Sequence, residues 1–250
     1  MDLSEAQVIE LFHIAFLDAL ARRLDRTRYV LKGGANLRYF FGSQRYSQDI
    51  DLDFVGEPPW SVQEKVSEVI ESRLLGALLK VAGLSVGEWS DKRQTDTTRR
   101  WKVGIVVPGR AELTRTKVEF SGRGGDERYR LEAVPERIVS PYALRAPLLQ
   151  HYTLEPATEQ KVEALALRTQ VQSRDVFDLD LLLRRQPLAP GQVSPELLEQ
   201  AAGVALGISF DAFSDQVLRF LEPEVRSYHD SAEDWERMQT YVAEKLEQAQ

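Results

Sequence analysis

Three aspartates, Asp49, Asp51 and Asp53, alternate with apolar residues along residues 48–55. A period of two predicts a half-buried strand that gathers the three carboxylates on one face. Residues i and i+2 of a strand lie about 6.6 Å apart along the chain, so two such carboxylates can converge on one divalent cation or on a pair of them. An edge strand that carries acids to prevent aggregation would also explain the pattern.

A glycine pair, Gly33 and Gly34, lies between the short apolar strand predicted at residues 29–31 and a short helix predicted at residues 36–41. Glycines in a strand-to-helix turn allow backbone N–H groups and a helix N-terminus to face a phosphate. A tight turn with positive φ is the ordinary explanation for such a pair. The acidic strand that follows could hold a cation for the same phosphate. The edge-strand explanation of the aspartates does not account for a glycine turn placed just before them.

Glu119 is a candidate third carboxylate. It lies in the alternating segment 113–121 and projects from the face opposite Val118 and Phe120. In a strand beside the acidic one, Glu119 would join the metal ligands. The alternative, which we weigh equally, is a solvated face that Glu119 shares with Lys117.

Two charged residues near the starts of predicted helices are further candidates. Lys161 belongs to the helix predicted at residues 158–171, and Asp175 to the helix predicted at residues 174–185. Taken alone, Lys161 is explained as a surface lysine and Asp175 as an acid that caps a helix.

The composition excludes several kinds of site. The 250 residues include no cysteine, which removes disulfides, thiol nucleophiles and cysteine-containing zinc sites. The three histidines, His13, His151 and His229, are far apart in the sequence, which argues against a histidine-rich metal site. We therefore expect any metal to be Mg²⁺ or Mn²⁺ held by carboxylates.

The chain carries no signal for a membrane. No apolar run approaches the roughly 18 residues of a membrane helix, and the acidic, amphipathic N-terminus is unlike a secretory signal. We expect a cytoplasmic protein without a membrane partner.

The net charge of −7 conceals a strong asymmetry. Residues 92–130 contain eleven Lys/Arg and five Asp/Glu, whereas residues 191–250 contain twelve acids and four bases. This distribution fits one basic face for a polyanion on an acidic body. A mixed solvated surface is the plainer explanation.

The remaining patterns predict an α+β fold, in which an N-terminal mixed sheet with helices is followed by a helical C-terminal half. The predicted domain boundary lies near residue 135, which gives domains 1–135 and 136–250. The other expected elements are a first helix capped by Ser4 and Gln7 that runs to about Leu24, a long helix at 58–83, strands at 84–89, 101–107 and 113–121, a loop at 122–126, and helices at 195–205, 210–221 and 232–248.

Four segments, taken in order across about residues 28–185, together resemble the AbiEii/AbiGii family of nucleotidyltransferase toxins. This family includes the MenT toxins and belongs to the polymerase-β-like superfamily. The matching segments are Leu31-Lys32-Gly33-Gly34, Arg45-x-Ser47-x-Asp49-Ile50-Asp51-Leu52, Glu159-x-Lys161 and Arg174-Asp175-x-x-Asp178-Leu179.

The resemblance implies a nucleotidyltransferase core in residues 1–135 and a helical domain that adds Lys161 and Asp175 to the site. Asp49 and Asp51 would hold Mg²⁺ or Mn²⁺, with Glu119 as our added candidate, and Asp175 would act as a base or a positioning acid. The residues expected to bind the NTP substrate are Lys32, Gly33, Gly34, Arg45, Ser47 and Lys161. The family often has threonine or serine after the glycine pair, where this chain has Ala35, which leaves altered nucleotide preference or weakened activity open.

The resemblance also implies a function. A toxin of this kind transfers nucleotides from an NTP to RNA, here the 3′ end of tRNA, and so blocks translation; a cognate antitoxin is its protein partner. The arginine-rich stretch 99–130 is the expected place for RNA phosphates. Two alternatives remain: an acceptor that is a small molecule such as an aminoglycoside, or a protein; and a catalytically silent module that binds a nucleotide or a partner.

Overall fold

The computed structural model describes residues 3–56, 59–92, 94–122 and 128–250. The chain forms two compact units. The first comprises the residues up to Phe40 together with Tyr46–Tyr152, and the second comprises Phe41–Arg45 together with Thr153–Gln250. The short segment just before the acidic strand therefore belongs to the second unit.

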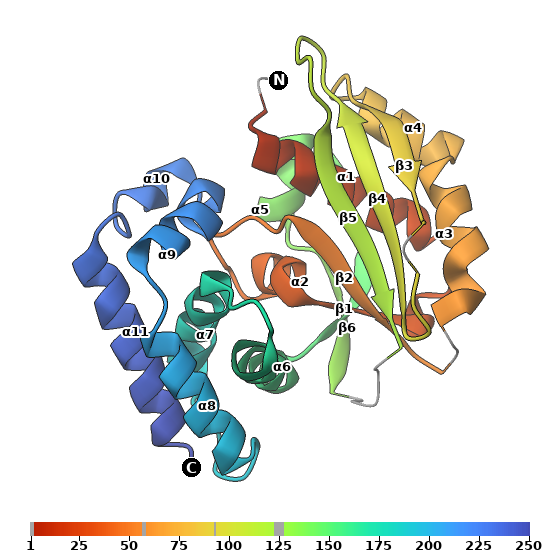
Figure 1. The fold of residues 1–250 in the computed structure, drawn as a ribbon. Coiled ribbons are helices and arrows are strands. Elements are labelled where there is room, and N and C mark those ends of the chain that lie inside the picture. Colours follow the sequence, from red (N-terminus) through yellow and green to blue (C-terminus); the bar gives the residue numbers. More distant parts are fainter. Residues whose placement is uncertain (1–2, 57–58, 93, 123–127) are drawn as a thin grey trace. The chain divides into compact units, whose positions relative to one another are not determined.

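A mixed seven-stranded sheet forms the centre of the first unit, in the order β3-β4-β5-β2-β1-β7-β6 (Figure 1). β2 runs parallel to β5 and β1 runs parallel to β7, while the other neighbouring strands are antiparallel. The acidic strand β2 thus lies in the middle of the sheet, between β1 and β5. The strands are β1 (Tyr29–Lys32), β2 (Asp49–Phe54), β3 (Ser85–Ser90), β4 (Thr98–Val106), β5 (Thr114–Ser121), β6 (Tyr129–Ala133) and β7 (Leu148–Tyr152).

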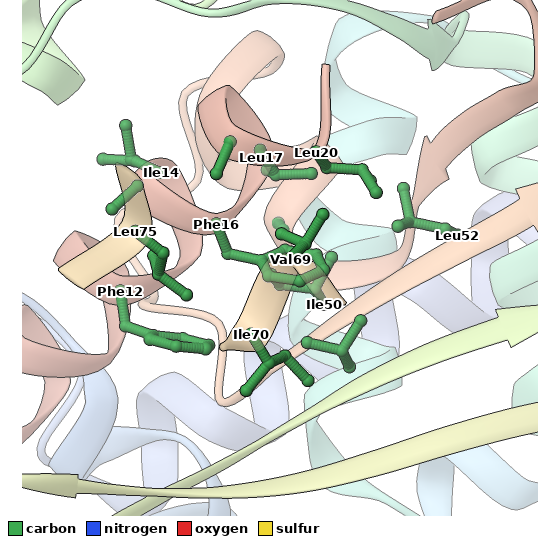
Figure 2. Close-up of a cluster of buried hydrophobic side chains, with 14 of the residues drawn as sticks. Phe12, Ile14, Phe16, Leu17, Leu20, Ile50, Leu52, Val69, Ile70 and Leu75 are labelled. Carbon is green, nitrogen blue, oxygen red and sulfur yellow. The ribbon is translucent and has the colours of Figure 1, made fainter. Parts of the chain in front are cut away.

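An apolar core lies between this sheet and the surrounding helices, and α1 contacts β5, α3 and α4. Figure 2 shows Ile50 and Leu52 of β2 among the side chains of this core, which also include Phe16 of α1 and Val69 of α3. Because side chains alternate along a strand, the aspartates of β2 face away from it. The helices of the unit are α1 (Glu5–Leu20), η1 (Arg26–Arg28), α2 (Gly33–Phe40), η2 (Pro59–Val62), α3 (Gln63–Ile70), α4 (Arg73–Lys80), α5 (Glu136–Val139) and η3 (Ser140–Tyr142).

The first helix begins as its sequence predicts. The Ser4 side chain accepts a hydrogen bond from the Gln7 backbone, and the Gln7 side chain accepts one from the Ser4 backbone, which satisfies two N–H groups at the helix start. The helix ends at Leu20, four residues before the predicted end.

The prediction of one long helix at residues 58–83 is wrong, because the short η2 and two α-helices, α3 and α4, fill this region. The Ser72 side chain accepts a hydrogen bond from the Leu75 backbone and starts α4 after a break that follows α3. Both helices keep their apolar side chains in the core, so the buried stripe survives the break. Residues 57–58, and 123–126 of the predicted loop, lie outside the described residues.

Strands β6 and β7 were not anticipated from the sequence. They form an antiparallel pair, and β7 joins the sheet beside β1 through Leu31 and His151. The first unit consequently extends to Tyr152, whereas the predicted domain boundary lies near residue 135.

The second unit is helical, as the sequence predicts. Its core contains Phe213 and Trp235, whose rings stack 4.3 Å apart. The predicted helix 210–221 divides into α9 and η4. No described helix of either unit is long and apolar enough to span a membrane. The helices are α6 (Leu154–Leu167), α7 (Ser173–Arg185), α8 (Pro195–Leu206), α9 (Phe210–Gln216), η4 (Leu218–Phe220), α10 (Pro223–Arg226) and α11 (Ala232–Glu247).

A buried histidine links the first helix to the residue that precedes β2. His13 Nε2 lies 2.7 Å from Thr116 Oγ1, and this hydroxyl donates to the carbonyl of Gln48 at 2.7 Å. Because the hydroxyl hydrogen is used on Gln48, Nε2 carries the proton and donates to Thr116. Burial lowers the pKa of His13 from 6.5 to about 3, so the ring stays neutral in the folded protein.

We expect acid to destabilise the fold through His13. Below pH 6.5 His13 becomes protonated in the unfolded chain but stays neutral in the folded chain. The stability that neutral His13 contributes is therefore complete above pH 6.5 and is lost as pH falls towards 3. His13→Gln, which retains a donor for Thr116, is expected to cost about 1–2 kcal/mol of unfolding free energy at pH 7.5. Urea unfolding from pH 7.5 to pH 4.5 should show this deficit shrinking; a deficit independent of pH would contradict the assignment.

Candidate active site

The acidic face of β2 is divided between two environments. Asp49 and Asp51 are half-buried, whereas Asp53 is 4% exposed. In the parallel register with β5, Asp49 lies beside Lys117, Asp51 beside Glu119 and Asp53 beside Ser121. The predicted strand and its acidic face are thus confirmed, but its three carboxylates are not equivalent.

Asp53 is neutralised by the protein itself. Its Oδ1 atom accepts from Lys32 Nζ at 2.5 Å and from Ser121 Oγ at 2.6 Å, while the Tyr152 hydroxyl donates to Oδ2 at 2.9 Å. Lys32 also donates to Ser121 at 2.7 Å. Asp53 therefore needs no bound cation, and the ammonium of Lys32, an expected nucleotide ligand, is held on this carboxylate.

Asp51 lies against the glycine turn. Gly33 has φ +66° and begins α2, and a Cβ atom built on it would lie 2.7 Å from Asp51 Oδ2. Burial, reinforced by the charges of Asp49 and Glu119, raises the pKa of Asp51. Its negative charge is thus poorly compensated within the protein, as expected of a carboxylate whose cation is supplied from outside.

Replacing Gly33 by alanine should therefore damage the fold and the site together. The positive φ and the close contact with Asp51 are expected to cost about 1–3 kcal/mol of unfolding free energy. Gly76→Ala is the matched control in the same unit, because Gly76 lies in α4 with nothing within 4 Å of an added Cβ; it should be neutral or stabilising by up to about 1 kcal/mol. Thermal unfolding of both variants tests this, and equal effects would contradict it.

The structure also shows what Ala35, next to the glycine pair, and Ser47, next to the acidic strand, do in the fold. Ala35 is fully buried and belongs to the apolar core, so the side chain at this position packs inside the first unit. Ser47 donates from Oγ to the carbonyl of Asp49 at 2.8 Å and fixes the turn into β2. Its expected contact with phosphate stays a prediction.

Two cationic side chains of β4 and β5 reach the same acidic face. Lys117 Nζ lies 3.1 Å from Asp49 Oδ2 and 3.6 Å from Glu119 Oε2, and Arg100 lies 2.7 Å from Glu119 Oε2. Burial lowers the pKa of Lys117, but the charges of Asp49, Asp51 and Glu119 outweigh it and leave that pKa raised. Lys117 therefore carries its charge among these carboxylates.

The donor set suits a hard divalent cation. Asp49 and Asp51 supply carboxylate oxygens on one face of β2, and Glu119 is in register with Asp51. Among the described residues, no three side chains of metal-binding type come together closely enough to hold an ion alone. Mg²⁺ commonly binds through one or two carboxylates together with water and substrate phosphates, so the pair fits an ion that arrives with a nucleotide.

The second unit holds another charged cluster, which is buried. Lys161 Nζ of α6 lies 2.9 Å from Asp175 Oδ1 and 2.6 Å from Asp178 Oδ2, both on α7. Arg45 donates to both carboxylate oxygens of Asp178, with Nη2 2.9 Å from Oδ2, and Arg168 Nε lies 3.2 Å from Asp175 Oδ2. Burial raises the pKa of Asp178, but Arg45 and Lys161 reverse that effect and leave it lowered.

Arg45 is fixed by its backbone as well as by its side chain. It forms an isolated bridge with Leu221, and the neighbouring Gln44 carbonyl accepts from the Glu222 backbone at 3.1 Å. The Arg45 side chain is 3% exposed. Arg45, a predicted nucleotide ligand, thus anchors the segment that leads to β2.

The predicted site residues consequently fall into two groups. The structure brings together those of the first unit on β1, α2, β2, β5 and the preceding turn, and Arg45, Lys161 and Asp175 gather in the second unit. Sequence reasoning missed the direct contact of Lys117 with Asp49 and the three partners of Asp53. Lys117 alternates with Glu119 in the sequence, but only the register of β2 with β5 shows that it reaches Asp49.

Solved structures share this fold at low sequence identity. The match with JHP933 from Helicobacter pylori covers 98% of this chain and 93% of JHP933, with 18% identity and a TM-score of 0.58. For an H. pylori structure described as a nucleotidyltransferase, both chains are covered to 99%, with 20% identity and a TM-score of 0.59. The match with MenT4, a nucleotidyltransferase toxin of Mycobacterium tuberculosis, covers 98% of this chain and 94% of MenT4, with 17% identity and a TM-score of 0.56.

These likenesses concern the fold, and they agree with the mixed sheet followed by a helical half. No curated protein sequence matches the chain. The model of the AbiEii family, described as the nucleotidyl transferase toxin of a type IV toxin–antitoxin system, matches residues 15–248. That match covers nearly the whole chain, both motif-bearing units included, and the chain therefore belongs to the AbiEii family of nucleotidyltransferase toxins.

Proposed function

We propose that this nucleotidyltransferase is a Mg²⁺-dependent toxin that transfers nucleotides from an NTP to the 3′ end of tRNA and thereby blocks translation. The observation that carries the proposal is the carboxylate pair Asp49 and Asp51, placed against the glycine turn at Gly33 with the charge of Asp51 poorly compensated. Such a site binds a cation and a phosphate side by side.

In the proposed reaction, the acceptor hydroxyl oxygen bonds to the α-phosphorus of the NTP and pyrophosphate leaves. Asp49 and Asp51 would hold Mg²⁺ or Mn²⁺, with Glu119 beside them, and such an ion would supply neutralisation of the phosphate charge and a lower pKa for the acceptor hydroxyl. Asp175 serves as a base or a positioning acid. The residues proposed to bind and orient the triphosphate are Lys32, Gly33, Gly34, Ser47 and Lys161, with Arg45 acting from its anchored position.

Charge on the face of the sheet that bears the aspartates favours a polyanionic acceptor. Lys102 and Arg115 of β4 and β5 are exposed on this face, and Lys102 is in register with Lys117, which is in register with Asp49. Cations that lead towards the carboxylates suit RNA phosphates better than a cationic small molecule. The substrates, an NTP and tRNA, place the proposed reaction in the cytoplasm. The family implies an antitoxin as the protein partner.

The deciding experiment combines the purified chain with each α-³²P-labelled NTP in turn, Mg²⁺ and total tRNA. Asp49→Ala is the test variant, and Glu64→Ala, an exposed acid on α3, is the matched control. We expect labelled tRNA with the wild type and Glu64→Ala, and none with Asp49→Ala or in EDTA.

Other outcomes would overturn specific parts of the proposal. Label on tRNA that does not require Asp49 would refute the assigned site. Nucleotide binding without labelled tRNA would refute tRNA as acceptor and point to a small molecule, a protein or a silent module.

A further inference from the structure

We propose that Lys117 is a resident counter-ion of the carboxylate site, which keeps metal affinity low until a metal–nucleotide complex arrives. The inference deepens the proposed function and rests on its assignment of Asp49 and Asp51 as metal ligands. Lys117 Nζ stands 3.1 Å from Asp49 Oδ2 and 3.6 Å from Glu119 Oε2. An ammonium thus already occupies space that a divalent ion on Asp49 would need.

The position of Lys117 is set by the sheet and not by a flexible loop. β2 and β5 run parallel, with Asp49 directly beside Lys117 and Asp51 directly beside Glu119, so all four side chains project from the same face. β5 is paired with β2 on one side of Lys117 and with β4 on the other, and the flanking residues Thr116 and Val118 are buried. The ammonium therefore returns to Asp49 whenever the metal site empties.

The charges of the group support a competition between Lys117 and the metal. The three carboxylates of Asp49, Asp51 and Glu119 face two cationic side chains, Lys117 and Arg100. Three negative and two positive charges leave this group with one uncompensated negative charge before any ion binds. A divalent ion added alone would leave an excess of positive charge, whereas an ion that arrives on a triphosphate brings its own compensation.

Partial burial makes the competition strong. The Lys117 side chain is 27% exposed and that of Asp49 is 25% exposed, so water screens their attraction less than at an open surface. On β4, Lys102 occupies the position directly across from Lys117 and is exposed. It provides a second lysine on the same face, one strand further from Asp49.

Lys117→Met and Lys102→Met remove the same charge at these two positions and form a matched pair. Direct titration of Mn²⁺ into the nucleotide-free chain, followed by the electron paramagnetic resonance of the free ion, measures metal affinity. Because a unit charge within about 4 Å of a partly buried ligand is removed, Lys117→Met should bind Mn²⁺ about tenfold more tightly than the wild type. Lys102→Met should change the affinity less than about twofold, since it lies a further strand away.

A second comparison separates this role from a general change of charge. With a non-hydrolysable NTP analogue present, the affinity advantage of Lys117→Met over the wild type should shrink several-fold, because the phosphates then offset the ammonium. Equal Mn²⁺ affinity for Lys117→Met and the wild type, or weaker binding by the variant, would overturn the proposal. An advantage shared equally by Lys102→Met would overturn it as well.

A measurement on the intact wild-type lysines covers the case in which Lys117→Met folds poorly. Reductive ¹³C-methylation preserves the charge of lysine, and the Lys117 signal can be assigned by its loss in Lys117→Arg. Mg²⁺ should shift this signal and leave the Lys102 signal in place; binding of Mg²⁺ without such a shift would overturn the proposal. A wild-type chain that binds neither ion, with or without nucleotide, would instead refute the metal assignment of the proposed function.

Discussion

Asp51→Asn is expected to abolish nucleotidyl transfer while leaving the fold at least as stable as the wild type. Loss of a partner that only supports a metal ligand typically costs 10–100-fold in affinity or activity, so loss of a ligand itself should cost at least about 100-fold. Stability should not suffer, because burial and the neighbouring charges of Asp49 and Glu119 disfavour the ionised form of Asp51. The amide removes that repulsion and retains the shape of the side chain.

The effect on stability should depend on pH in a defined direction. An unfolded aspartate loses its proton near pH 3.8, whereas folded Asp51 keeps its proton to a higher pH. Between these two pKa values the folded chain binds more protons than the unfolded one, so the stability contributed by Asp51 falls as pH rises. The advantage of Asp51→Asn over the wild type should therefore be small at pH 3.5 and grow towards neutral pH.

Asp53→Asn is the matched control on the same strand. Asp53 is neutralised by Lys32 and hydrogen-bonded by Ser121 and Tyr152, so its replacement should cost about 1–3 kcal/mol of unfolding free energy. Urea unfolding between pH 3.5 and pH 7.5, paired with the labelled-tRNA assay, measures both variants. A destabilised Asp51→Asn chain, or one that retains transfer, would contradict the assigned role.

The contrast between these aspartates shows what the sequence can predict. The alternation along β2 is local, and it correctly predicts the strand and the acidic face because only a period of two buries Ile50 and Leu52 together. The partners that distinguish Asp53 come from β1, β5 and β7. Tyr152 lies 99 residues away in the sequence, and no local pattern encodes such a contact.

β7 and the break between α3 and α4 could not be predicted from the sequence for similar reasons. β7 is only five residues long and directly precedes a helix, so its periodicity is too short to distinguish a strand from a helix. Its identity as a strand depends on pairing with β1 and β6. The break between α3 and α4 rests on one local feature, the capping by Ser72, but the continuous apolar stripe on both sides conceals it.

The candidate site was predictable as a set of residue types but not as a set of contacts. The motifs select Asp49, Asp51, Lys161 and Asp175 without any knowledge of the fold. The neighbours that adjust their charge depend on strand register and on helix packing, as Lys117 does beside Asp49. Because electrostatic interactions fall off with distance and depend on burial, they can be assigned only once the chain is folded.

Breaking the buried ion pair of Arg45 and Asp178 is expected to lower the unfolding free energy strongly. Asp178 is fully buried and receives the guanidinium of Arg45 and the ammonium of Lys161. Asp178→Ala would leave these cations without their shared carboxylate, and breaking a buried pair in this way costs about 3–5 kcal/mol. Asp180→Ala is the control on the same helix, because its partner in the i,i+4 pair, Arg184, is 56% exposed, and such pairs contribute at most about 1 kcal/mol.

A double variant separates the charge from the packing. Arg45→Met combined with Asp178→Leu removes both charges and fills the space, while Lys161 keeps Asp175 as its partner. Such replacements of buried ion pairs are often neutral or stabilising, so the double variant should recover most of the stability lost in Asp178→Ala. Urea unfolding and amide hydrogen exchange along α7 measure this recovery, and equal loss in both variants would refute an uncompensated charge as the cause.

Activity then shows whether the pair only stabilises the fold or also contributes to the proposed transfer through the segment that leads to β2. Arg45 lies four residues before Asp49, and it is anchored in the second unit by Asp178 and by the bridge to Leu221. An apolar pair restores packing but lacks the bidentate geometry of a guanidinium on a carboxylate, which fixes direction as well as distance. We therefore expect the double variant to be stable yet impaired in transfer by about tenfold or more, since small displacements of reacting groups have effects of this size. A stable double variant with full activity would limit the pair to a structural role.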